Sequence, residues 1–283
     1  MQMANENNRR ESITSRILES QTKLNKLSIA EIINQIQELG VKRGGVLLVH
    51  TSFRSIRPME GGPMGLIKAL LDAIGPKGTL VMPSWTGNDE EPFDPEITPA
   101  SPDLGIVADI FWRLPGVQRS NHCFAFAAVG PKAAIITSDP LPLPPHVHES
   151  PVGRVYDLDG HILLLGVGHD ANTTLHLAEL LAGVPYGVPR YCTMLKEGCP
   201  VRIDYMENDH CCERFVIVDE WLRAHGLQSE GCVGHAHARL VKARDIVDIA
   251  LEHLAHDPLL FLHFEREGCV ECDEARKSIK SLK

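Results

Sequence analysis

Several features that would define other classes of protein are missing from this chain of 283 residues. No apolar run is long enough to cross a bilayer, so the sequence argues against a membrane-spanning helix. Residues 1–26 are polar and contain no apolar signal core, and we therefore expect a cytoplasmic protein. Neither a P-loop nor a Gly-x-Gly-x-x-Gly turn between a strand and a helix is present, so nucleotide hydrolysis and hydride transfer lack support.

An excess of positive charge is also missing. The chain has 28 Lys and Arg against 37 Asp and Glu, a net charge of −9 with histidine neutral. Nucleic-acid binding depends on neutralising phosphates with basic side chains, so this balance argues against a nucleic-acid partner. A surface of one sign concentrates ligands of the other, which favours a small polycationic partner, although solubility alone would also explain the acidity.

Strand and helix patterns alternate along the chain and predict an α/β fold. The expected sheet is mostly parallel or mixed, with helices on both faces. Predicted strands cover residues 46–49, 79–82, 125–129, 162–165 and 201–205, and predicted helices cover residues 28–39, 65–73, 104–114, 214–226 and 243–256. The proline-rich stretch 139–151 is expected to be a loop. We expect a single domain over residues 27–283, after a polar extension at 1–26.

The most informative segment follows the predicted strand 162–165. The chain breaks at two glycines and then starts a helix with His176 in its first turn and Glu179 three residues later, on the same face. The positive end of the helix dipole disfavours the imidazolium, so we expect a neutral ring. A neutral imidazole beside a carboxylate at a strand's carboxyl end is a good general base. The alternative is a core histidine beside a solvated glutamate.

The same segment, Gly-Val-Gly-His-Asp-Ala-Asn-Thr-Thr-Leu-His-Leu-Ala-Glu at residues 166–179, closely resembles the signature of the aminoglycoside 3-N-acetyltransferases, the antibiotic N-acetyltransferase family. Three other blocks resemble this family in the same order, at residues 45–54, 78–84 and 119–128. The apramycin- and gentamicin-acetylating type IV branch is the most similar, by the blocks 139–146 and 208–214. The resemblance implies this family's fold, acetyl-CoA as co-substrate, an aminoglycoside as the polycationic partner and antibiotic resistance.

Polar residues at the ends of predicted strands are candidates for binding coenzyme A. Thr51 and Ser52 follow one strand and Ser84 another, so they lie at the carboxyl edge of the sheet, where α/β proteins bind ligands. Ordinary hydrogen bonds at strand ends are the alternative. With the resemblance, the expected coenzyme A contacts are Thr51, Ser52, Phe53, Arg54, Ser84, Ser120 and His122. Family members commonly have proline after that histidine, where this chain has Cys123, which weakens the prediction for His122.

A cationic substrate needs carboxylates, and two short acidic loops follow predicted strands. One contains Asp89 and Glu90, and the other contains Glu207 and Asp209. Trp85 could add a cation–π face. The expected aminoglycoside contacts are Trp85, Asp89, Glu90, His146, Asp170, Glu207 and Asp209. Solvated surface acids are the alternative interpretation.

The expected reaction is direct acetyl transfer. The ammonium group of the aminoglycoside must lose a proton before it attacks the thioester. His176 would take this proton while Glu179 orients the ring. Backbone N–H groups at the helix start, or the hydroxyl of Thr51 or Thr173, would stabilise the oxyanion. None of the eight cysteines lies in a nucleophile motif, so no covalent intermediate is expected.

The cysteines near the C-terminus suggest a metal site. Cys269 and Cys272 have the spacing of half a tetrahedral zinc site, and His210, Cys211 and Cys212 could complete it. We expect a structural zinc ion that attaches the C-terminal tail to the acidic substrate loop. Reduced thiols without metal are the alternative.

Other functions remain open at this point. The same fold could acetylate a non-antibiotic amine, since the pocket loops decide the substrate. A zinc-dependent hydrolase could use His169, Asp170 and His176 as ligands, although their spacing differs from the common helical His-x-x-x-His pair. A non-catalytic, zinc-containing binding module would leave His176 and Glu179 without a purpose.

Overall fold

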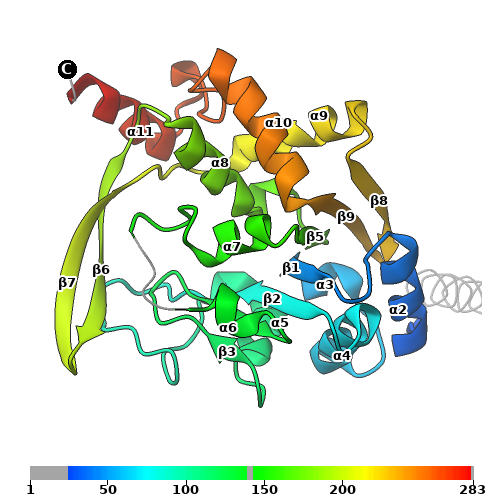
Figure 1. The fold of residues 1–283 in the computed structure, drawn as a ribbon. Coiled ribbons are helices and arrows are strands. Elements are labelled where there is room, and N and C mark those ends of the chain that lie inside the picture. Colours follow the sequence, from blue (N-terminus) through cyan, green and yellow to red (C-terminus); the bar gives the residue numbers. More distant parts are fainter. Residues whose placement is uncertain (1–24, 139–142, 282–283) are drawn as a thin grey trace, which may run out of the picture.

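The computed structural model describes residues 25–138 and 143–281, and its centre is a seven-stranded mixed sheet (Figure 1). The strand order is β3-β4-β2-β1-β5-β9-β8. The strands are β1 (Val46–Thr51), β2 (Thr79–Pro83), β3 (Gln118–Arg119), β4 (Phe126–Val129), β5 (His161–Leu165), β8 (Gln228–Val233) and β9 (Ala236–Lys242). Strands β2, β1 and β5 are parallel, and the outer pairings are antiparallel. The predicted α/β class with a mixed sheet is confirmed.

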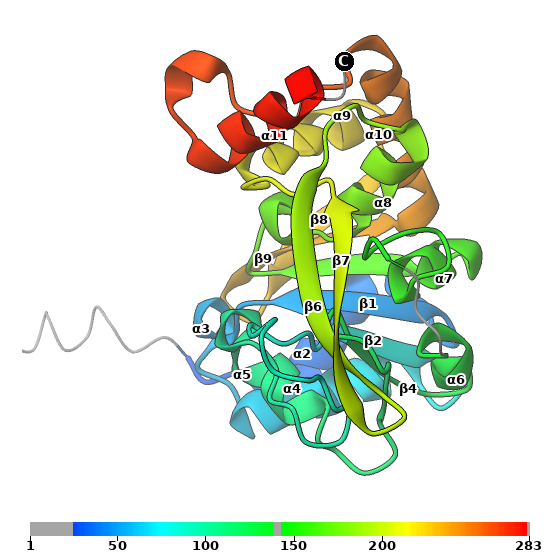
Figure 2. The same ribbon diagram turned by 90° about the vertical axis from the view of Figure 1, so that its left-hand side faces the viewer.

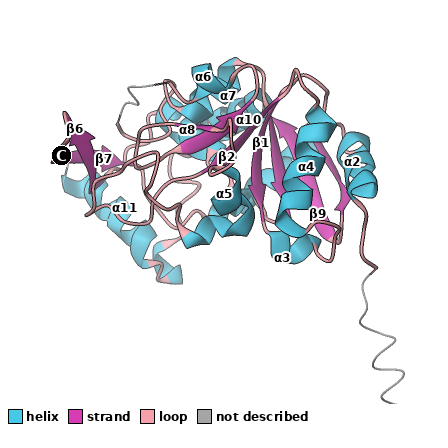
Figure 3. Cartoon of the chain, turned by 90° about the horizontal axis from the view of Figure 1, so that it is seen from below, coloured by secondary structure: helices cyan, strands magenta, loops and turns pink. Residues whose placement is uncertain are grey.

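Helices cover both faces of the sheet, so its central strands are buried on both sides (Figure 3). Side chains alternate along a strand. Leu47 and Val49 of β1 therefore pack into one core with helices α2 (Ile29–Glu38), α4 (Gly62–Ile74) and α5 (Gly105–Phe111). Val46 and Leu48 pack into the other core. Its helices are α6 (Ala133–Ile136), α7 (Pro151–Asp157), α8 (Thr174–Ala182), α9 (Val218–Ala224) and α10 (Ala243–His256).

Local signals in the sequence account for several helix boundaries. Helix α2 starts with the predicted capping box, in which Ser28 accepts a hydrogen bond from the backbone N–H of Glu31 and the Glu31 carboxylate accepts one from Ser28. Helix α7 starts at Pro151, immediately after the predicted proline-rich loop. The remaining short elements are α3 (Phe53–Ile56), η1 (Pro102–Leu104), η2 (His169–Ala171), η3 (Glu213–Ile217) and η4 (Glu265–Glu267). The polar extension and residues 139–142 lie outside the described residues.

A long hairpin stands apart from the sheet and crosses one of its edges (Figures 1 and 2). It consists of β6 (Val188–Lys196) and β7 (Cys199–Glu207), which pair antiparallel. The predicted strand 201–205 is the central part of β7. The C-terminal helix α11 (Val270–Ser281) packs near the start of β6, where Ser278 Oγ accepts a hydrogen bond from the Gly187 N–H.

The topology brings several loops to one edge of the sheet. Strands β1, β2 and β5 all end there because they are parallel, and the segment before the antiparallel strand β4 lies there too. The hairpin adds residues 188–207 to the same side through a bridge between Phe93 and Met194. Within the described ranges, no helix has both the length and the apolar character needed to cross a membrane.

Candidate active site

His176 and Glu179 form a direct hydrogen-bonded pair at this edge. Helix α8 starts at Thr174, whose N–H donates to the side chain of Asn172, so His176 lies in the first turn as the sequence predicts. The Nδ1 atom of His176 lies 2.9 Å from Oε2 of Glu179. Because the carboxylate accepts from Nδ1, the Nε2 atom of the neutral ring carries the lone pair.

Glu179 is fully buried, so the alternative of a solvated helix glutamate is wrong. Its carboxylate accepts four hydrogen bonds: from His176, from Tyr186 Oη, from Asn208 Nδ2 and from His210 Nε2. Burial alone would raise the pKa of Glu179, but the charge of His210 and the hydrogen bonds from His176 and His210 lower it to about 2. The carboxylate therefore remains ionised at neutral pH and fixes the His176 ring.

The environment of the His176 ring differs from the sequence prediction in one respect. Burial disfavours its protonated form, but the nearby Cys212 sulfur and the Glu179 carboxylate favour it, and the net result is a pKa raised well above the ordinary value. The prediction of a ring kept neutral by the helix dipole is therefore wrong. A dipole contributes about 0.3–1 kcal/mol, whereas an opposite charge within hydrogen-bond distance shifts a pKa by about 1–3 units.

Two further side chains contact the His176 ring. The Cys212 sulfur lies 3.3 Å from Nε2, and the ring of His146 stacks on that of His176 with 5.3 Å between centroids. His146 is buried, and burial lowers its pKa well below the ordinary value, so it is neutral. His146, predicted to contact the substrate, thus lies directly beside the proposed base.

The residues predicted to bind coenzyme A fall into two groups. Thr51, Ser52 and Phe53 are partly exposed at the end of β1, and Arg54 is exposed. The remaining three are buried, namely Ser84, Ser120 and His122.

The buried members of that group already have bonds within the protein. Ser84 Oγ accepts from Arg119, and Ser120 Oγ accepts from the N–H of Phe126. Sequence reasoning missed this structural role because the partners come from neighbouring segments. The Nδ1 atom of His122 accepts from the Phe124 N–H, whereas its buried Nε2 atom has no hydrogen-bond partner among the described residues. A ligand that reaches this edge could use that nitrogen.

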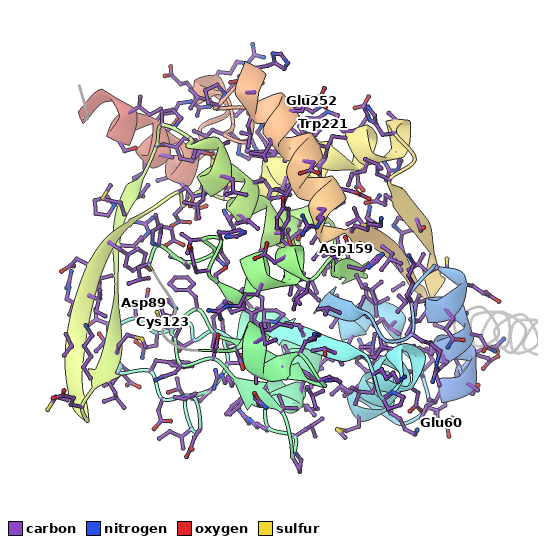
Figure 4. The ribbon with its side chains drawn as sticks, in the orientation of Figure 1. Glu60, Asp89, Cys123, Asp159, Trp221 and Glu252 are labelled. Atoms are coloured by element: carbon purple, nitrogen blue, oxygen red, sulfur yellow. The ribbon has the colours of Figure 1, made fainter. Side chains whose placement is uncertain are left out.

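The two predicted acidic loops do come together at the hairpin. Tyr191 Oη donates to Glu90 at 2.6 Å, and Thr193 Oγ1 donates to the carbonyl of Asp89 at 2.8 Å. Figure 4 shows Asp89 between the hairpin and the sheet. Glu207, at the end of β7, has its pKa raised to about 7 by burial and by the charges of Asp209 and Asp89. The carboxylates therefore repel one another and form a site suited to a polycation.

The other predicted substrate residues are less uniformly placed. Asp209 is bound by Arg190, at 2.7 Å, and Arg190 also contacts Glu274 of α11 at 3.4 Å. Arg190 carried no signal in the sequence and reduces the negative charge that Asp209 can offer. Trp85 is partly buried with its ring edge-on to Phe126. Asp170 is exposed in η2.

The five predicted zinc ligands lie in two different clusters. Cys211, Cys269 and Cys272 form one cluster with His263, which the sequence analysis did not include. His210 and Cys212 instead contact Glu179 and His176. The only sequence signal for His263 is its position six residues before Cys269.

Fold and site together define an α/β protein in which a carboxylate-oriented histidine lies beside an acidic face. The family model for aminoglycoside 3-N-acetyltransferases matches residues 48–255. The chain is 68% identical over 234 residues to the aminoglycoside N(3)-acetyltransferase IV of a Salmonella species, covering 83% of this chain and 90% of that protein. It is 32% identical over 245 residues to the aminoglycoside N(3')-acetyltransferase-like protein YokD of Bacillus subtilis, covering 77% and 89%. The chain belongs to the aminoglycoside 3-N-acetyltransferase family and is an acyltransferase.

Solved structures support the same conclusion. The apoenzyme of aminoglycoside acetyltransferase AAC(3)-IVa matches with a TM-score of 0.89 and 64% identity, over 91% of this chain and 99% of that one. The structure of AAC-IIIb with CoASH matches with a TM-score of 0.75 and 25% identity, over 82% and 97%. The resemblance to the type IV branch is confirmed.

Proposed function

We propose that this chain transfers the acetyl group of acetyl-CoA to the 3-amino group of an aminoglycoside and so confers resistance. The observation that carries the mechanism is the His176–Glu179 pair, in which a buried carboxylate lies 2.9 Å from Nδ1 and leaves Nε2 as the nitrogen that exchanges a proton with the substrate. Solved complexes with a gentamicin and with apramycin belong to a histidine-to-alanine variant of the relative AAC(3)-IVa. These relatives support an aminoglycoside as the acceptor, and the CoASH complex supports coenzyme A as the acetyl carrier.

In the proposed reaction, His176 Nε2 removes a proton from the 3-ammonium group, and the free amine attacks the thioester carbonyl. Glu179 stays ionised because of its low pKa and stabilises the imidazolium. The substrate amine takes the position at Nε2 that the Cys212 sulfur occupies here. The hydroxyl of Thr51 or Thr173 and backbone N–H groups at the start of α8 are the proposed oxyanion donors. The C–S bond then breaks, the nitrogen loses its second proton and the leaving sulfur takes up a proton, so the amide and the free thiol form while the proton on His176 passes to solvent.

We assign the two substrates to two different regions beside the His176–Glu179 pair. We assign the arm of coenzyme A to the end of β1, where Thr51, Ser52 and Phe53 are partly exposed and Arg54 can meet a phosphate. We assign the ammonium groups of the aminoglycoside to the acidic face formed by Asp89 and Glu207.

A zinc ion and a cytoplasmic location complete the proposal. The zinc is structural, as the sequence suggests, with Cys211, His263, Cys269 and Cys272 as its ligands. A cytoplasmic location fits an enzyme that uses acetyl-CoA and retains free cysteines.

The hydrolase alternative has less support from the geometry. Of its three suggested ligands, His169 is fully buried with one ring nitrogen 2.8 Å from Gln228 Oε1 and the other 3.2 Å from Asn172 Nδ2. Neither nitrogen is free for a metal ion. Acetylation of a non-antibiotic amine remains compatible with the same base and the same acidic face.

Release of free thiol from acetyl-CoA tests the proposed function. The purified protein is incubated with acetyl-CoA and apramycin, gentamicin, kanamycin or no acceptor. Thiol release that requires an aminoglycoside, with NMR of the product showing an acetylated 3-amino group, is the expected result. Acetyl-CoA binding without release for any aminoglycoside would direct the search to other amines.

A further inference from the structure

The peptide segment 208–212 connects the cysteine cluster with the catalytic pair. Asn208 and His210 both donate hydrogen bonds to Glu179, at 2.9 and 2.7 Å, and Cys212 contacts His176. Between them, the side chain of Cys211 faces the cluster with His263 and the two C-terminal cysteines. Three of the five residues in this segment therefore touch the catalytic pair, and a fourth belongs to the cluster.

The cluster has the dimensions of a tetrahedral zinc site. With Zn–S bonds of about 2.3 Å and a Zn–N bond of about 2.0 Å, two sulfurs lie about 3.8 Å apart and a sulfur and a nitrogen about 3.5 Å apart. The sulfurs of Cys211 and Cys272 lie 3.6 Å apart, and they lie 3.2 and 3.8 Å from His263 Nδ1. All four potential ligand atoms, including the sulfur of Cys269, lie within 4.8 Å of one another.

The orientation of His263 supports a metal site independently. Its Nδ1 atom faces the sulfurs, whereas its Nε2 atom lies 3.5 Å from the carboxylate of Glu213. A carboxylate on the far nitrogen is the usual partner of a zinc-bound histidine, because it fixes the ring and makes the other nitrogen a better ligand. Three cysteines and one histidine form a closed structural set that leaves no coordination position for substrate or water.

Side-chain contacts hold the segment in place, and they include the ion pair of Asp209 with Arg190 as well as the cysteine cluster. Residues 208–212 lie beyond the end of β7 and carry no helix or strand, and Cys212 has a left-handed backbone with φ of 61°. The side chain of Cys211 faces the cluster while those of His210 and Cys212 face the catalytic pair, so anchoring Cys211 restrains both of its neighbours. Loss of this anchor would loosen Asn208 and His210, the two residues of the segment that donate hydrogen bonds to the Glu179 carboxylate.

We propose that zinc bound by Cys211, His263, Cys269 and Cys272 positions the catalytic pair through the segment 208–212. The zinc has no part in the chemistry; it fixes His210, which holds Glu179 and through it the His176 ring. This inference rests on the proposed acetyltransferase function. Catalytic geometry is sensitive, since a displacement of about 1 Å can reduce a rate about a hundredfold.

The first test measures metal content and activity in the full-length protein purified without chelator. We expect one zinc ion per chain. The variant Cys269→Ser should lose zinc, and its kcat should fall about ten- to a hundredfold with little change in acetyl-CoA binding. Cys232→Ser is the matched control, because Cys232 is an exposed free cysteine outside the cluster, and it should retain both zinc and activity.

A milder variant covers the case in which Cys269→Ser does not fold. Glu213 is 75% exposed, so Glu213→Gln removes the carboxylate from His263 at little expected cost in folding. It should weaken zinc binding about ten- to a hundredfold. Zinc removal should also increase hydrogen exchange in the segment 208–212, and added zinc should restore both protection and kcat.

The outcomes separate the two proposals. If the wild-type protein purified without chelator contained no zinc and were fully active, the metal site would be overturned. Bound zinc whose removal leaves kcat and the exchange of 208–212 unchanged would overturn the positioning role. Zinc-loaded protein that transfers acetyl groups to no aminoglycoside would contradict the proposed function, while its exchange data would still decide whether zinc orders the segment.

Discussion

Replacing Glu179 by glutamine tests the catalytic pair with almost no change in shape. One oxygen of Glu179 accepts from His176 and Asn208, and the other accepts from Tyr186 and His210. A glutamine must point its NH2 group at one of these two sets of donors. Two buried groups then lose their acceptor, at about 1–3 kcal/mol each, so the free energy of unfolding should fall by about 2–6 kcal/mol.

The effect on turnover should be larger. Without the carboxylate charge, the His176 imidazolium loses the stabilisation that Glu179 gives, and the tautomer with its lone pair on Nε2 is no longer selected by a charged acceptor on Nδ1. A comparable change in serine proteases reduces kcat by about 10⁴, and we expect a loss in kcat/KM of about 10²–10⁴. Thiol release measures the rate, and thermal unfolding measures the stability. Because Glu179 also raises the pKa of His176, the acid limb of the variant should move to lower pH, and the loss should be smaller on the wild-type acid limb than above it.

The control is Tyr186→Phe, which removes one donor and keeps the carboxylate. It should reduce turnover less than tenfold and stability by about 1 kcal/mol. If Glu179→Gln retained near-normal turnover while folded, Glu179 would not orient a general base, and the proposed mechanism would be refuted.

The remaining predictions concern pH and substrate binding. His176 must be neutral to accept a proton and its pKa is raised, so kcat/KM should increase as pH rises above neutrality. Cys212→Ser removes an interaction that raises this pKa, and the acid limb of the measured pH profile should move to lower pH; an unmoved limb would assign it to another group. Glu207→Gln should raise the KM for apramycin more than that for acetyl-CoA, and equal changes would contradict the assignment. In the wild type, the apramycin KM should fall as pH rises through about 7, because Glu207 then ionises; a flat profile in steady-state assays would count against this.

The parts of the structure that depend on local geometry were predictable. Helix spacing alone places Glu179 on the same face as His176, and the observed contact of 2.9 Å follows from it. The capping box at Ser28 and the alternation of strands and helices are local signals of the same kind. Parallel strands end at one edge, so Thr51 and Ser84 were correctly expected there, although the sequence did not show that the hydroxyl of Ser84 is already bonded to Arg119.

The parts that depend on tertiary contacts were not predictable. Asn208 and His210 bond Glu179 from a distant segment, and Cys212 reaches His176 from the same segment. Cys212 and Glu179 together outweigh the helix dipole that the sequence suggested. The adjacency of His210, Cys211 and Cys212 in the sequence suggested that all three could bind the same zinc ion, which the structure does not support. Consecutive side chains of the segment 208–212 point to opposite sides, so only Cys211 joins the cluster.

The central claim is that His176 is the base for acetyl transfer, and its direct test is the turnover of His176→Ala beside the wild type. Both proteins are measured at saturating acetyl-CoA and apramycin, with acetyl-CoA binding determined separately. The account predicts a loss in kcat of at least about a hundredfold, the usual contribution of a general base, with unchanged affinity for acetyl-CoA. A kcat within a few-fold of the wild type would contradict it.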